Sequence, residues 1–173
     1  VSEEIRREKL FKTFRKYGWT GVALVVIVVG GTGYREYSRA AEKTASEIFG
    51  SSVLEALQEN DPSTRVAQLD TITAPNASAG AMIAMLQAAE LTSENDGAGA
   101  VAKLEAAAVA VDLDQMYRDI LSFKRLTVAE SGIDADERRM GFEQLATPGN
   151  PLRLLAEEQL ALMDLTEGDS AAA

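Results

Sequence analysis

Residues 97–110 read GAGAVAKLEAAAVA, a stretch of small and apolar residues without proline. Alanine is the strongest helix former, so this composition predicts a helix that packs closely against its neighbours. The string Leu104-Glu-Ala-Ala-Ala recurs 38 positions later as Phe142-Glu-Gln-Leu-Ala. Helix pairs that repeat at about this interval are typical of an α-solenoid, such as the tetratricopeptide array with its period of about 34 residues. The sequence therefore predicts an all-α fold.

The surrounding chain predicts further helices of the same array. Their expected spans are 38–58, a short helix from Pro62 or Ser63, 77–92, 97–110, 115–131, 134–146 and 152–166. Gly50-Ser51-Ser52 is a candidate break in the first helix. Gly132 and Gly168 are expected to end two of the others as C-caps. No stretch sustains the alternating Val, Ile, Thr and Tyr pattern of a β-strand.

One stretch before the repeat has a different character. Residues 19–37 read WTGVALVVIVVGGTGYREY, and the 18 residues 17–34 carry no charge. A helix of that length measures about 27 Å, close to the bilayer core of about 30 Å. Tyr17 and Trp19 at one end, with Tyr34 and Tyr37 at the other, match the aromatic belts of a membrane-spanning helix. We therefore expect one transmembrane helix in contact with the lipid bilayer.

The charges on either side of the apolar stretch predict its orientation. Six Lys and Arg residues lie in 1–16, whereas 23 acidic and 10 basic residues follow from Ser38 onward. Positive flanks stay in the cytoplasm, so the acidic bulk is expected outside it. An amphipathic helix on an anionic leaflet is an alternative role for the basic segment. A cleaved signal peptide is disfavoured because no clean cleavage site follows.

These features predict four parts of the chain. They are a basic cytoplasmic segment (1–16), the transmembrane helix (17–37), an extramembrane helical connector (38–76) and a tetratricopeptide-like repeat domain (77–173) whose last hairpin is incomplete. Gly30, Gly31 and Gly33 offer a helix–helix contact within the membrane, since small residues let such helices approach. Glycine is frequent in membrane helices in any case, so this contact remains an alternative.

The composition argues against catalysis and against cofactors. The chain has no cysteine and no histidine, which removes thiolate ligands and the commonest general base. Asp134, Asp136 and Glu137 lack calcium-loop spacing and are interpreted as acids of a first helical turn. We expect no enzyme activity, no cofactor, no metal, no small-molecule substrate and no nucleic acid, because an acidic domain repels phosphates.

Several residues leave two interpretations open. Lys124 with Arg125, and Arg138 with Arg139, fit either a solvated face or a site for partner carboxylates. Met82, Met85 and Met140 fit core packing or, alternatively, an adaptable peptide-binding surface. Tyr117 and Phe123 are expected to pack inside the solenoid.

The order of these features resembles that of the YfgM-type proteins. The residues that carry the resemblance are Lys16-Tyr17-Gly18, the span closing on Gly33-Tyr34 and Tyr37, and the strings Ala88-Ala89-Glu90-Leu91, Lys103-Leu104-Glu105-Ala106 and Tyr117-Arg118-Asp119-Ile120-Leu121. The resemblance implies a single-pass protein of the bacterial inner membrane with a periplasmic tetratricopeptide-like domain. It further implies a role ancillary to the Sec translocon, alongside a membrane-anchored chaperone.

Two functions follow as hypotheses. In the first, the chain is a membrane-anchored scaffold that binds partner proteins on its helical repeats. In the second, it is an accessory subunit of a larger inner-membrane complex, respiratory or photosynthetic, held by its transmembrane helix. The first hypothesis places the binding surface on the solenoid, and the second places it on the span.

Overall fold

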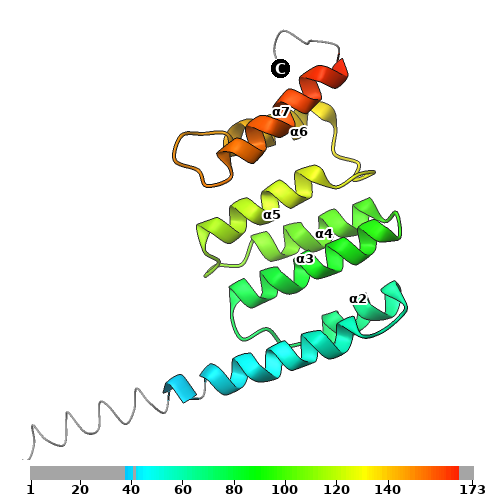
Figure 1. Ribbon diagram of the computed structural model, residues 1–173, viewed down its shortest axis with the longest axis vertical. Helices are drawn as coiled ribbons and strands as arrows, with labels where there is room; N and C mark the ends of the chain where they lie inside the picture. Colours follow the sequence, from blue (N-terminus) through cyan, green and yellow to red (C-terminus); the bar gives the residue numbers. More distant parts are fainter. Residues whose placement is uncertain (1–37, 41, 168–173) are drawn as a thin grey trace, which may run out of the picture. The chain divides into compact units, whose positions relative to one another are not determined.

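The computed structural model describes residues 38–40 and 42–167 (Figure 1). The chain divides into two compact units, one up to Glu47 and one from Ile48 onward. In the first unit, residues 38–40 and 42–47 are helical, and Lys43 pairs with Glu47 one turn later at 3.8 Å. Within the described residues every regular element is a helix, which confirms the all-α prediction. No helix among them has the length and apolar composition of a membrane span.

The helices follow one another at the predicted interval. In the second unit, residues 48–57 are helical, and then come α2 (Pro62–Thr71), α3 (Ala77–Ser93), α4 (Gly97–Ala108), α5 (Gln115–Thr127), α6 (Ala135–Leu145) and α7 (Arg153–Glu167). The starts of α3, α5 and α7 are 38 residues apart, as are those of α4 and α6. Leu104 and Phe142, the residues whose strings recur, are both 1% exposed. The recurrence in sequence therefore marks equivalent core positions.

The starts of α3 to α6 are each fixed by a short polar side chain. Asn76, Asp96, Asp114 and Asp134 precede α3 to α6, and each side chain accepts a hydrogen bond from a backbone N–H of the first turn. Such caps satisfy amide groups that have no partner within the helix. The prediction of first-turn acids is confirmed for Asp136 and Glu137, whereas Asp134 lies one position earlier, as the N-cap of α6.

Three apolar clusters hold the helices from residue 48 onward together. The first contains Val53, Ala56, Leu69 and Ile83 and joins residues 48–57 to α2 and α3. The second lies among α3, α4 and α5 and contains Ala81, Ala88, Ala100, Val101, Leu104, Leu113, Leu121 and Val128. The third joins α5, α6 and α7 through Leu126, Phe142, Leu145 and Ala156. Each helix pair thus shares a core with the next pair, as expected for a solenoid.

Two predicted helix boundaries are wrong. Gly50-Ser51-Ser52 does not interrupt its helix, which continues to residue 57. The helix predicted over 115–131 ends at Thr127, and its C-cap is the extended Val128, not Gly132. The Arg138 guanidinium donates hydrogen bonds to the carbonyls of Leu126 and Val128, so a side chain of α6 ends α5. Gly132 lies in the following loop with a φ of +76°. The predicted cap at Gly168 lies outside the described residues.

Two glycines provide a matched test of this packing. A Cβ on Gly97 would lie 2.2 Å from the backbone carbonyl oxygen of Ala129, which cannot move aside easily, whereas a Cβ on Gly50 would meet nothing within 4 Å. We expect Gly97→Ala to lower the free energy of unfolding by about 1–3 kcal/mol through overpacking. Gly50→Ala should raise it by up to about 1 kcal/mol through helix propensity. Urea denaturation followed by circular dichroism measures both, and equal effects of the two variants would contradict this packing.

The cap of α2 predicts a pH dependence. Hydrogen bonds from Ser63, Thr64 and the Thr64 backbone lower the pKa of Asp61 to about 2. Because the folded pKa lies below the ordinary 3.8, this carboxylate contributes stability above that value and loses it as the pH falls towards 2. Asn is also a good N-cap but does not titrate. The stability difference between wild type and Asp61→Asn should be present at pH 7 and vanish near pH 2 in urea titrations; a pH-independent difference would contradict the assignment.

Candidate protein-binding site

A cavity opens where the first helices of two successive pairs meet. α3 contacts α5 as well as α4, and the three helices line an open cavity of about 300 Å³. We call it the α3–α5 cavity. Its lining residues are Met85, Ala88, Ala89, Thr92, Leu104, Lys124, Thr127 and Val128. Three lining residues, Ala88, Leu104 and Val128, are buried members of the second apolar cluster, so the floor of the cavity is part of the core.

The α3 side of this cavity continues as an apolar row. Met82, Met85, Ala89 and Thr92 are spaced three and four apart, which places them on one face of α3. Met85 is partly buried against the core, but Met82 is 44% exposed and Met140 on α6 is 56% exposed. Core packing, the interpretation favoured from the sequence, is therefore right for Met85 and wrong for the other two. Flexible methionine side chains suit a surface that adapts to different partners.

Lys124 gives the cavity a positive charge. Within residues 48–167 it is the one Lys or Arg side chain without an ion pair or a hydrogen bond to a carbonyl. It is exposed and lies in the last turn of α5, where a cation also interacts favourably with the helix dipole. An apolar cavity beside a free ammonium group fits a protein segment that carries an apolar side chain next to a carboxylate.

The other basic residues of the two predicted pairs make internal contacts. Arg125 donates from one Nη1 to Glu105 at 2.8 Å and to Glu137 at 2.9 Å, which ties α4, α5 and α6 together. Arg139 pairs with Asp164 of α7 at 2.7 Å. Arg138 ends α5 through its contacts with Leu126 and Val128. For these three arginines, both the solvated face and the partner-binding interpretation are wrong, and only Lys124 remains available.

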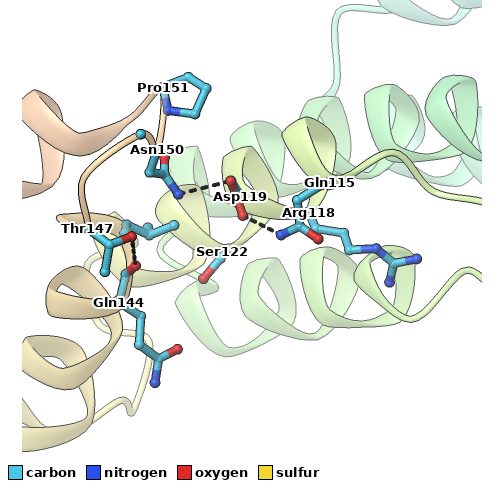
Figure 2. A pocket seen from close by; sticks show the side chains of 10 residues that line it. Gln115, Arg118, Asp119, Ser122, Gln144, Thr147, Asn150 and Pro151 are labelled. Atoms are coloured by element: carbon cyan, nitrogen blue, oxygen red, sulfur yellow. Dashed lines mark hydrogen bonds between the residues drawn. The ribbon is translucent and has the colours of Figure 1, made fainter.

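A second, polar cavity lies between α5 and the loop from α6 to α7 (Figure 2). Its volume is about 630 Å³. At its centre the Asp119 carboxylate accepts a hydrogen bond from the Gln115 amide at 2.7 Å and another from the Asn150 amide at 3.0 Å (Figure 2). The Asn150 contact fixes the loop against α5. Since its central carboxylate is engaged by internal partners, we assign this cavity a structural role.

Arg118 borders the polar cavity and has a distinct role. Its guanidinium donates hydrogen bonds to four backbone carbonyls at the end of α4 and in the next turn, those of Ala108, Ala110, Val111 and Leu113. Arg65, Arg118 and Arg138 each stand four residues after the N-cap aspartate of their helix and bind carbonyls of the preceding segment. This role was not predicted from the sequence, where its signal is the spacing Asp-x-x-x-Arg.

A polar network joins α2, α3 and α4 beside the first cluster. Asp70 accepts from the Lys103 ammonium at 2.6 Å and from the Gln87 amide at 2.7 Å. The Lys103 hydrogen bond first, and then that of Gln87, hold the pKa of Asp70 below its ordinary value. Gln87 is 3% exposed and also contacts the Val66 carbonyl at 3.3 Å. This network fixes α3 and therefore one wall of the α3–α5 cavity.

The predicted aromatic packing is confirmed. Tyr117 is partly buried against the second apolar cluster. The rings of Phe123 and Phe142 lie 5.7 Å apart, edge to face. The described residues contain no acidic cluster that could hold a metal ion. The predicted interface aromatics Tyr17, Trp19, Tyr34 and Tyr37, and the glycines Gly30, Gly31 and Gly33, lie outside the described residues.

Comparison with known proteins identifies a family. A family model described as a tetratricopeptide repeat-like domain matches residues 9–147, most of the 173-residue chain. Neither the curated proteins nor the solved structures contain a significant match.

Arg118 provides a test of the helix-ending role. Replacing it with methionine keeps most of the apolar stem but leaves partly buried carbonyls without their donor. We expect Arg118→Met to lower the free energy of unfolding by about 1–3 kcal/mol. Arg153→Met removes only an exposed pair with Glu157 one turn away and should cost less than about 0.5 kcal/mol. Urea denaturation of both variants measures the difference, and similar losses would contradict the role of Arg118.

Proposed function

Because the chain belongs to the family of tetratricopeptide repeat-like domains, we propose that it is a membrane-anchored scaffold that binds segments of partner proteins. Stacked helical repeats create extended surfaces for such binding and typically perform no catalysis. The observation that carries the proposal is the α3–α5 cavity, whose apolar floor and unpaired Lys124 form a recognition site on the repeat.

The cavity determines what a partner segment must offer. A volume of about 300 Å³ accommodates an apolar side chain or two, which the Met85 side chain can adjust to. The Lys124 ammonium pairs with a carboxylate carried next to that side chain. Such a site is small, so its affinity is weak by itself. Anchoring to the membrane beside the partner compensates by raising the effective concentration.

The location and the partner complex are the finer part of the proposal. The predicted span over 17–37, the six basic residues before it and the acidic bulk after it support a cytoplasmic N-terminus and a periplasmic repeat domain. The resemblance to the YfgM-type proteins supports the inner membrane as the location and the Sec translocon with a membrane-anchored chaperone as the partners. The scaffold then holds its binding surface where secreted chains emerge.

Photocrosslinking in bacterial cells tests the proposal. A photoreactive amino acid replaces Ala89, an exposed residue of the cavity wall, in the full chain. The control position is Asp136, which is exposed on α6. We expect translocon or chaperone subunits to crosslink at residue 89 and not at residue 136. Lys124→Glu should reduce the yield several-fold because it reverses the charge beside the cavity.

A further set of positions distinguishes the two hypotheses from the sequence. If crosslinks form from residues 18–33 and none form from residue 89, the scaffold function is wrong and the accessory-subunit function gains support. Crosslinks at residue 89 that are insensitive to Lys124→Glu contradict the role of the ammonium group.

A further inference from the structure

The last described helix is apolar on two opposite sides, and α6 covers one of them. Ala156, Leu160 and Met163, spaced four and three apart, pack against Phe142 and Leu145 of α6. Leu154, Leu155, Leu162 and Leu165 are 77%, 47%, 48% and 54% exposed. At about 100° per residue these four leucines lie on the side of α7 opposite to the packed one. We call them the open face of α7.

Within the array, a helix with two apolar sides has a neighbour on each. α3 places Ile83 in the cluster shared with α2 and Ala81 and Ala88 in the cluster shared with α4. α7 has the composition of such an intermediate helix. Single exposed leucines are ordinary on a protein surface, but four on one helix face mark an interaction site.

Four covered interfaces of the array, α2–α3, α4–α5, α5–α6 and α6–α7, share a second feature, an ion pair between the two helices. Arg65 pairs with Glu90 between α2 and α3. Arg125 pairs with Glu105 of α4 and with Glu137 of α6, and Arg139 pairs with Asp164 between α6 and α7. In each case a basic side chain of one helix meets an acidic side chain of its neighbour beside an apolar cluster.

The open face of α7 has the apolar side chains of such an interface and an acidic side chain, Glu158, but no basic partner for it within residues 48–167. Glu158 lies one turn after Leu154 and one turn before Leu162, so it stands among the leucines. It is exposed, and no side chain of the described residues forms an ion pair with it. The neighbouring Glu157 is held by Arg153 at 2.7 Å, which leaves Glu158 as the carboxylate available on this face.

The charge of this face decides which occupant fits. In a symmetric pair of copies the same patch meets itself, so the apolar contact would contain two Glu158 carboxylates and no cation to pair with them. The acidic excess from Ser38 onward adds to this repulsion. We propose that the open face of α7 binds an amphipathic helix of another protein, with an apolar stripe and a central Lys or Arg that pairs with Glu158. This site lies apart from the α3–α5 cavity and does not depend on the proposed function.

Two synthetic peptides test the proposal. Both are net-neutral helices with leucines at heptad spacing, and they differ only in a central Lys or Glu. The full chain is held in phosphatidylcholine nanodiscs, and empty nanodiscs give the background of peptide bound to lipid. Fluorescence anisotropy measures the affinity. We expect the Lys peptide to bind about fivefold more tightly than the Glu peptide, and Glu158→Lys to reverse that order.

Matched variants distinguish binding at the open face of α7 from non-specific hydrophobic binding. Leu162→Ser should abolish the binding of both peptides, whereas Val111→Ser, at a residue that is 90% exposed outside α7, should leave it unchanged. Both positions are solvent-exposed, so the urea midpoints should stay close to that of the wild type. Equal affinity for the two peptides, no binding, or binding insensitive to Leu162→Ser would overturn the proposal. A concentration-dependent dimer that Leu162→Ser dissolves would assign the face to a second copy and would also overturn it.

Discussion

The close contact between α3 and α4 is the constraint on which the other helices depend. It is made by small side chains, among them Ala81 and Ala88 on α3 and Ala100 on α4, which are at most 4% exposed. Larger residues would separate the two helices. Because they lie close, Leu104 of α4 reaches α5 and also forms the floor of the α3–α5 cavity. The α3–α5 cavity is therefore shaped by the same alanines that form the core.

Nearly every Lys and Arg side chain of the described repeat helices forms an ion pair or a hydrogen bond within the fold. An acidic repeat domain has few Lys and Arg residues, and most of them connect helices or end them. Arg118 and Arg138 bind the carbonyls that close α4 and α5. Lys124 beside an apolar cavity and Glu158 on an apolar face have no ion-pair partner among the described residues. Each adds a preferred charge to a surface that would otherwise select partners by apolar contact alone.

The local signals in the sequence were largely sufficient for the fold. Asp134, Asp136 and Glu137 indicated a helix start because acidic residues in a first turn are a local signal. The recurrence of Leu104 as Phe142 predicted the repeat because equivalent core positions favour similar residues. The prediction that Gly132 caps α5 was wrong because Arg138, a side chain of α6, ends this helix at an earlier residue. The sequence around a helix end does not reveal a capping side chain that a different helix supplies.

The sequence by itself determined the helices, their order and their interval, because these follow from periodicity and from caps within a few residues. It also determined the unequal charge on either side of the predicted span. Only the tertiary structure decided which apolar and charged side chains are covered. Met82 and Met85 share one helix face, yet one is exposed and the other packs against the core. The sequence of a helix determines which of its faces are apolar, whereas the burial of those faces depends on which neighbouring helices pack against them.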